Sequence, residues 1–155
     1  MGKVLVSYFS ASGVTRGVAE KIKSTLNCDI FEIEPVEKYT KEDLNWMNRN
    51  SRSSVEMNNL SFRPPVLNKV KNIDEYDTVI IGFPVWWYTA PTIINTFIEE
   101  NNLDGKKIYV FVTSGSSGCE KSFNDLKNTY PNLLFVSSKR FNGHETNEEY
   151  IKFIE

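Results

Sequence analysis

Short apolar runs alternate with amphipathic stretches along most of the chain. The first run, Val4 to Phe9, is almost continuously apolar, which is typical of a strand buried on both faces of a parallel sheet. A helix N-capped by Thr15 is predicted next, because apolar positions between 18 and 26 recur at helical spacing. Further strands are predicted at 28–33, 78–83, 107–113 and 133–137, and further helices after Pro91, around Phe123 to Tyr130 and over Thr146 to Glu155. This alternation indicates βαβ units, and we expect an α/β fold: a doubly wound three-layer sandwich of about five strands.

The segment Glu34–Asn72 does not follow this alternation. It contains a possible capping start at Thr40 to Asp43, followed by a polar run from Asn48 to Ser54. A loop of this length without any structure of its own would be unusual in a compact domain. We therefore expect a helix within this excursion and a position over a site.

Composition restricts the classes of function. The chain has 155 residues and is 40% hydrophobic, which suits one domain over residues 1–155 with a substantial core. A net charge of −2 with 25% charged residues gives no basic stripe for nucleic acid. No apolar run approaches the ~20 residues of a membrane span, and the start lacks the pattern of a signal peptide. Cys28 and Cys119 are expected to be reduced thiols, which favours a cytoplasmic protein.

Small and hydroxyl residues form the turn after the first strand: Ser10-Ala11-Ser12-Gly13-Val14-Thr15. Ligands of parallel sheets bind at the carboxyl ends of strands, where helix N-termini present free N–H groups. Gly13 permits a positive φ or a close backbone approach. The turn therefore predicts a phosphate nest built from neutral donors, since it contains neither a P-loop lysine nor a G-x-G-x-x-G run. An ordinary strand-to-helix turn is the alternative, because turns use these residues anyway.

Two more loops are predicted at the same edge of the sheet. Phe83–Pro91 contains three consecutive aromatic residues, which would form a flat wall for an aromatic ring system. The alternative is that one or two of them pack on the next helix. Thr113–Cys119 is rich in Ser and Gly and suits hydrogen bonding to ligand heteroatoms, although it could also be a flexible turn. Together the three loops predict a phosphorylated aromatic ligand, and flavin mononucleotide (FMN) is the obvious candidate.

These motifs resemble those of the flavodoxin family. Ser10–Thr15 resembles its phosphate loop, (S/T)-x-(S/T)-G-x-T. Phe83–Tyr88 is similar to the F-P-x-x-W-(F/Y) segment of quinone reductases with the same fold, and Thr113–Gly118 resembles a T-(S/T)-G-x-S-G loop of those reductases and of short-chain flavodoxins. The resemblance covers essentially the whole chain. It implies a flavodoxin-like three-layer α/β/α sandwich with a five-stranded parallel sheet in the order 2-1-3-4-5.

The resemblance also implies a set of FMN contacts. The phosphate would be bound by Ser10, Ala11, Ser12, Gly13, Val14 and Thr15. The inner edge of the isoalloxazine would be held by Pro84, Val85, Trp86, Trp87 and Tyr88. Its pyrimidine side would bond Ser114, Gly115 and Ser116, with Thr113 and Gly118 as further members of that loop. No catalytic residue and no metal ligand is expected.

The same resemblance leaves two functions open. Flavodoxins carry electrons to a redox partner protein, whereas the reductases take electrons from NAD(P)H and pass them to small quinone-like acceptors. Many carriers have a glycine in the second loop that allows a peptide flip beside flavin N5. Val85–Tyr88 has no glycine, and a positive φ strains bulky residues, which argues against that conformation here. The third loop also lacks the tyrosine that covers the flavin in many carriers, so one face is open unless Trp46 covers it.

The remaining polar residues do not decide between these functions. His144 is expected on the surface or at a helix start, and Tyr88 could donate a proton or serve in the core or in stacking. Arg49, Arg52 and Glu56 are expected on a solvated face of the excursion, and contact with a substrate or the ribityl chain is the alternative. Size and overall resemblance favour electron transfer. An NAD(P)H-dependent quinone-type reductase and a flavin-free interaction module are the alternatives.

Overall fold

The sheet of the computed structural model, which describes residues 3–155, consists of five parallel strands in the order β2-β1-β3-β4-β5. The strands are β1 (Lys3–Tyr8), β2 (Asp29–Glu32), β3 (Tyr76–Pro84), β4 (Lys107–Thr113) and β5 (Leu134–Arg140). The helices are α1 (Val14–Leu26), α2 (Arg52–Met57), α3 (Thr92–Glu100), α4 (Glu120–Thr129) and α5 (Asn147–Phe153), with a 3-10 turn, η1 (Ile73–Glu75), before β3. The predicted α/β class and the strand order 2-1-3-4-5 are confirmed.

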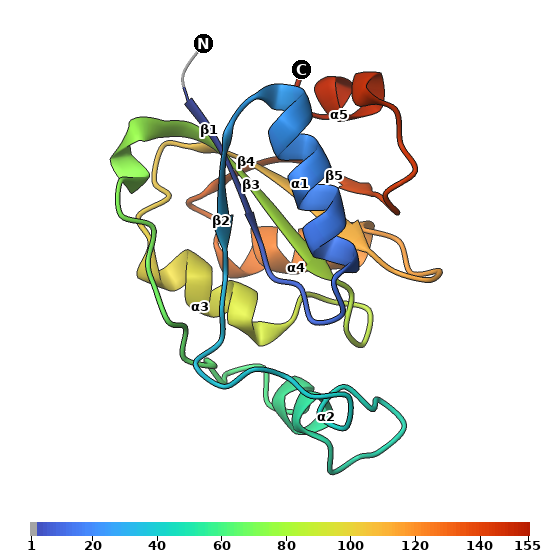
Figure 1. Cartoon of the computed structure of the whole chain (residues 1–155). Helices are drawn as coiled ribbons and strands as arrows, with labels where there is room; N and C mark the ends of the chain where they lie inside the picture. Colours follow the sequence, from blue (N-terminus) through green and yellow to red (C-terminus); the bar gives the residue numbers. More distant parts are fainter. Residues whose placement is uncertain (1–2) are drawn as a thin grey trace.

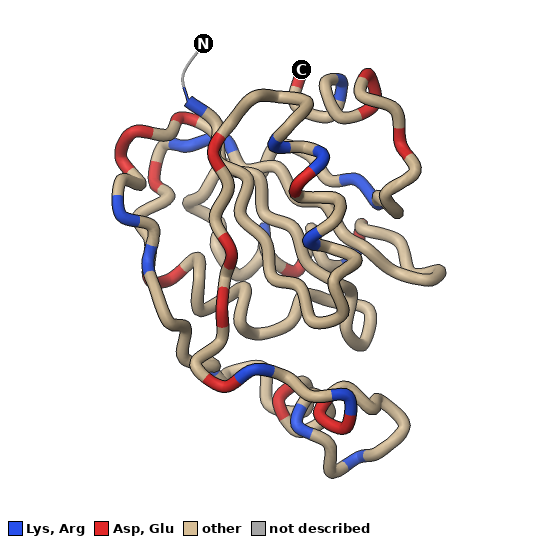
Figure 2. The backbone as a smooth tube through the Cα atoms, viewed as in Figure 1, with Lys and Arg blue, Asp and Glu red and all other residues tan. Residues whose placement is uncertain are grey.

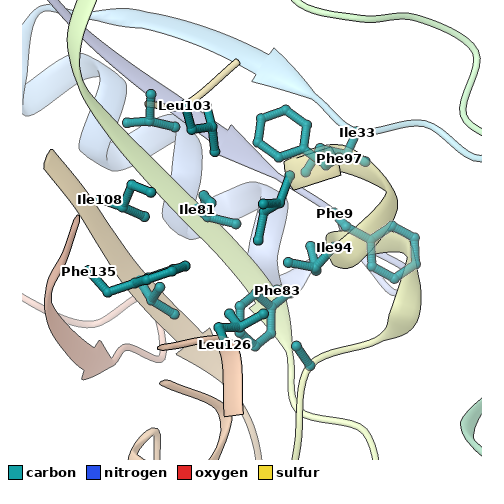
Figure 3. Packing of buried hydrophobic residues seen from close by; sticks show 14 of the residues in the cluster. Phe9, Ile33, Ile81, Phe83, Ile94, Phe97, Leu103, Ile108, Leu126 and Phe135 are labelled. Carbon is teal, nitrogen blue, oxygen red and sulfur yellow. The ribbon is translucent and has the colours of Figure 1, made fainter. Parts of the chain in front are cut away.

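Helices cover both faces of the sheet, with α1 and α5 on one face and α3 and α4 on the other (Figure 1). On the first face, Val18 and Ile22 of α1 pack against Val6 and Ile80 of the sheet. On the second face, residues of β3, α3 and α4 interdigitate, as Figure 3 shows for Ile81, Ile94 and Leu126. The residues of β3 between 79 and 83 are all buried, as expected for the central strand of a parallel sheet.

One glycine is required by packing between strands. Gly82 of β3 lies beside Phe111 of β4, and a Cβ added to Gly82 would lie 2.0 Å from Cζ of that ring. The Phe111 ring therefore occupies the space that a side chain at position 82 would need. A side chain at position 82 would therefore displace this ring near the edge that carries the predicted loops.

The excursion between β2 and β3 has a paired base. Val36 N–H donates to Pro65 O and Leu67 N–H donates to Glu34 O, at 3.0 and 2.9 Å. Figure 1 shows the rest of the excursion, with α2, extending beyond the sheet on the side of the loops that follow β1 and β3. The excursion thus contains a helix, as predicted.

The helix does not begin at the predicted capping start. Thr40 and Asp43 do exchange the two hydrogen bonds of a capping box, at 2.9 and 3.2 Å, but the chain then continues as turns. Helix α2 begins later, at Arg52, where the Ser51 side chain accepts from Ser54 N–H. A local capping signal without an apolar face behind it does not propagate a helix here.

Two other element boundaries differ from the prediction. Helix α1 is capped by Gly13, and Thr15 lies inside its first turn. Strand β5 continues to Arg140, three residues beyond the predicted end at Ser137, because Lys139 and Arg140 still pair with β4. No helix within residues 3–155 is both long and apolar enough to span a bilayer.

Candidate functional site

Three loops without charged residues follow the carboxyl ends of β1, β3 and β4, at residues 9–15, 84–91 and 113–119 (Figure 2). In a parallel sheet with this order, the three strands are direct neighbours. The loops therefore lie at one edge, where ligands of such folds bind. We call them the first, second and third loop.

The first loop is shaped by Gly13. Its φ is 98°, a conformation that favours glycine, and its N–H donates to Ser10 Oγ at 3.0 Å. Thr15 is buried, and its Oγ1 lies 2.7 Å from Oγ1 of Thr113. The predicted capping role of Thr15 is therefore wrong: its hydroxyl instead joins the first loop to the end of β4.

Unpaired backbone donors remain at the start of α1. The N–H groups of Ser12, Val14 and Thr15 have no hydrogen-bond partner anywhere in residues 3–155. Such groups carry the positive end of the helix dipole and bind anions readily. The neighbouring guanidinium of Arg16 is engaged elsewhere, in an ion pair of 2.6 Å with Glu32. The loop thus fits a phosphate held by neutral donors.

The second loop forms a two-residue hairpin. Trp86 N–H donates to Thr89 O at 2.9 Å, and Thr89 N–H donates to Trp86 O at 3.0 Å. Between them, Trp87 and Tyr88 have φ values of 49° and 67°. This is the geometry for which Asn-Gly is the usual sequence. The strain of a positive φ, which argued against a flipped peptide in this loop, therefore does not keep Trp87 and Tyr88 out of that region, because the turn that closes this hairpin requires it.

The three aromatic residues of the second loop have separate environments. Trp86 packs edge-on against Phe9 and Tyr39, with ring centroids 5.6 and 5.3 Å apart. Trp87 and Tyr88 remain 40% and 70% exposed at the tip of the hairpin. One aromatic residue therefore serves packing, although against the excursion and the start of the first loop rather than the next helix, and two are free to contact a ligand.

A hollow of about 690 Å³ separates the second loop from the third. It is lined by Val85 to Tyr88, by Ser114 to Ser117, and by Leu44 and Trp46 of the excursion. Its size and its mixture of aromatic and polar walls are those of a cofactor site. Trp46 is 70% exposed and stands at the rim, as the expected position of the excursion over a site suggests.

The other predicted site residues do not line this hollow. Ser10 and Ala11 line a smaller neighbouring hollow of about 140 Å³. Thr113 is buried behind the loops in its bond to Thr15, and neither Pro84 nor Gly118 lines the larger hollow. The structure thus brings the second and third loops together directly, with the first loop beside them.

A buried charge cluster lies within the excursion and includes Tyr39, whose ring contacts Trp86 of the second loop. Glu56 is only 5% exposed and accepts hydrogen bonds from Tyr39 Oη and from Arg52 Nε, the latter at 2.9 Å. The guanidinium of Arg52 also lies 3.8 Å from the centre of the Tyr39 ring. Burial and the bond to Glu56 raise the pKa of Tyr39, so its hydroxyl remains a donor. The expected solvated face is therefore wrong for Arg52 and Glu56 and correct for exposed Arg49.

Some contributors to the site carry no motif. Tyr39 and Leu44 come from the excursion, and Arg140 comes from the end of β5, where it donates to the third loop. The only sign in the sequence of the role of Tyr39 is that it is an aromatic residue within a polar segment. Nothing in the local sequence distinguishes Arg140 from a solvated cation, because its partners lie 25 and 26 residues away.

The remaining chemical candidates lie outside the hollow. His144 is exposed in the loop after β5. Cys28 and Cys119 are free, as predicted, and burial raises the pKa of the Cys28 thiol. Within residues 3–155, no cluster of His, Cys, Asp and Glu could hold a metal ion.

Comparison with known proteins gives a consistent picture. The family model described as Flavodoxin matches residues 3–155. A candidate flavoprotein from Bacteroides eggerthii is 44% identical with a TM-score of 0.97, over 99% of this chain and 96% of that one. One from Bacteroides uniformis is 42% identical with a TM-score of 0.93, over 99% and 97%. A flavoprotein from Lactobacillus acidophilus, solved in complex with FMN, shares the fold at 20% identity with a TM-score of 0.76, over 100% of both chains. A search of curated proteins found no match.

Proposed function

Since the chain belongs to the flavodoxin family, we propose that it binds FMN at the loop edge of its sheet and that the bound flavin passes electrons to a redox partner. The observation that carries this proposal is the meeting of three uncharged loops with different chemistry at one edge. Unpaired N–H groups of the first loop lie at the same edge of the sheet as a hollow of about 690 Å³ with aromatic and polar walls. The complex with FMN of the related Lactobacillus acidophilus protein supports the choice of cofactor.

Each loop has a distinct part in this proposal. Ser12, Val14 and Thr15 would donate to the phosphate through their N–H groups. Trp87 and the backbone of the third loop would bound the ring on two sides. When bound, FMN supplies the redox chemistry, while the chain binds and orients it and adjusts its electronic surroundings.

A second candidate function is that of an NAD(P)H-dependent reductase acting on a small quinone-like acceptor. The observation in its favour is the open rim of the hollow. The third loop has no aromatic residue, and Trp46 lies at the edge with 70% of its surface exposed. A planar reactant could therefore approach between Trp46 and the third loop. The cytoplasmic location expected from the cysteines, and the identity of the partner, remain predictions.

The cofactor is tested by titrating the purified apoprotein with FMN and following flavin fluorescence. Gly13→Asp places a negative charge among the donors of the first loop and should abolish binding. Gly105→Asp is a matched control, because Gly105 also has a positive φ and open space around it but lies before β4, at the opposite edge. Equal FMN affinity in wild type and Gly13→Asp would refute the proposed phosphate site. An apoprotein that takes up no FMN would favour the flavin-free interaction module.

The two redox functions are separated by mixing the FMN-loaded protein anaerobically with NADH or NADPH. Rapid bleaching of the flavin absorbance, with turnover when a quinone is added, would identify a reductase. A flavin that is not reduced by either nucleotide, but accepts electrons one at a time from a chemical reductant, would support the carrier.

A further inference from the structure

We propose that Arg140 is a positioning residue of the flavin site, which holds the third loop so that two of its backbone N–H groups face the pyrimidine end of the ring. This inference rests on the proposed binding of FMN. It concerns a residue that belongs to none of the three loop motifs, since Arg140 is the last residue of β5.

The guanidinium of Arg140 binds the third loop at three points. Its Nε donates to Ser114 Oγ at 3.1 Å, and its Nη2 donates to Ser114 O at 3.1 Å and Gly115 O at 2.9 Å. The side chain can reach them because Arg140 pairs with Val112, near the end of β4 from which the loop departs. A planar, permanently charged donor with a fixed fork of N–H groups suits this task better than any other side chain.

These contacts determine the direction of two peptide planes. In a trans peptide, the C=O and the N–H of the same unit point in opposite directions. The carbonyl of Ser114 shares its peptide with the N–H of Gly115, and the carbonyl of Gly115 shares its peptide with the N–H of Ser116. Because Arg140 binds both carbonyls, both N–H groups point away from the guanidinium.

The two N–H groups have no hydrogen-bond partner among residues 3–155. Gly115 and Ser116 both line the hollow opposite Trp87. Two adjacent donors held in parallel are suited to the carbonyl and nitrogen acceptors along one edge of a flavin. Without Arg140 the exposed, glycine-containing loop would lose this orientation, since the other side-chain bond within it runs from Ser114 Oγ to Ser117 O.

Arg140 also brings a charge to a loop that has none. Its side chain forms no ion pair with any carboxylate in the described part of the chain. A positive charge behind the pyrimidine end favours the reduced flavin, which carries more electron density there, over the oxidised one. Arg140 should therefore strengthen the binding of both forms and raise the midpoint potential.

The test uses Arg140→Gln and Arg140→Lys, with Lys139→Gln as the matched control. Lys139 is the exposed neighbour on β5, and its side chain has no hydrogen-bond or ion-pair partner in residues 3–155, so its substitution removes the same charge without touching the loop. Each apoprotein is titrated with FMN and with riboflavin, and the midpoint potential of the FMN complex is measured. Thermal melting of the apoproteins establishes that the variants are folded.

We expect Arg140→Gln to weaken FMN binding about tenfold, a typical effect of losing oriented hydrogen bonds to a ligand. Riboflavin should weaken by the same factor, because the phosphate lies at the other end of the site. If the variant also loses a tenfold preference for binding reduced over oxidised flavin, its two-electron midpoint potential falls by about 30 mV. Arg140→Lys should preserve most of the potential but not the affinity, since an ammonium keeps the charge without bridging both carbonyls. Lys139→Gln should change neither quantity.

Several outcomes would overturn the inference. Unchanged FMN affinity and potential in a folded Arg140→Gln, while wild type binds FMN, would refute the role of Arg140 and leave the proposed function standing. An equal effect of Lys139→Gln would assign the result to overall charge. A loss confined to FMN and absent for riboflavin would place the effect at the phosphate. Should Arg140→Gln fail to fold, Arg140→Lys provides the same comparison. A wild type that binds no FMN would refute both this inference and the proposed function.

Discussion

From the hairpin of the second loop we predict a reversal of the usual ranking in stability of glycine and alanine variants. Tyr88 has a φ of 67° and is 70% exposed, so its backbone is strained while its ring contributes little packing. We predict that Tyr88→Gly is more stable than Tyr88→Ala. At ordinary positions alanine is the more stabilising of the two, because glycine gains more conformational freedom on unfolding.

The magnitude follows from two opposing terms. A non-glycine residue in the left-handed region costs roughly 1–2 kcal/mol, which glycine avoids. The greater entropy of glycine in the unfolded chain takes back about 0.4–1 kcal/mol. Both variants lose the same ring, so its contacts cancel in the comparison. The glycine variant should therefore be more stable than the alanine variant by about 0.5–1 kcal/mol, or about 2 °C in melting temperature for a chain of this size.

Urea denaturation of the apoproteins measures this difference, provided that the slope of unfolding free energy against urea is unchanged between variants. Lys69 supplies the control, since it is exposed, lies in a loop and is not among the residues with positive φ. There Lys69→Ala should be more stable than Lys69→Gly. An alanine variant at position 88 that equals or exceeds the glycine variant would refute the claim that the hairpin is strained.

Three further predictions concern the scaffold. Gly82→Ala should destabilise the protein by about 1–3 kcal/mol, with partial recovery when Phe111→Leu removes the obstructing ring; denaturant titration of the single and double variants measures both effects. Arg52→Ala leaves the Glu56 carboxylate buried without its cation, which should cost about 3 kcal/mol and raise proteolysis within the excursion. Burial alone would raise the pKa of Glu145, but backbone and tyrosine hydrogen bonds lower it below the ordinary 4.5. Its contribution to stability is therefore complete above pH 4.5 and lost as pH falls through the lower folded value, so Glu145→Gln should flatten that part of the acid-unfolding curve.

The sequence allows the sheet and most of the candidate site to be predicted, because these depend on local patterns. Continuous apolar runs identify strands that are buried on both faces, and β3 is the clearest case. The positive φ of Gly13 is predictable because glycine tolerates that conformation in a turn. The exposure of Trp87 and Tyr88 agrees with the prediction that aromatic residues in a loop at the carboxyl edge face a ligand.

The parts that could not be predicted depend on partners far away in the chain. The hydroxyl of Thr15 could cap its own helix or bond elsewhere, and only the position of Thr113, 98 residues later, decides between the two. The burial of Glu56 depends in the same way on Tyr39 lying across from it. The positive φ of Trp87 and Tyr88 results from the hairpin that the second loop forms. Residue propensity alone predicts a negative φ at both positions.

The two ends of the candidate site therefore have different physical origins. At the phosphate end, the donors are fixed by contacts within a few residues, such as the bond of Gly13 to Ser10, and by the start of a helix. At the ring end, the walls are fixed by long-range contacts, with Trp86 against Tyr39 and Arg140 against the third loop. Substitutions distant in sequence should consequently alter the redox properties of a bound flavin while leaving recognition of its phosphate intact. The ratio of FMN to riboflavin affinity should thus respond to changes in the first loop only, whereas the potential should respond to changes in the excursion and in β5.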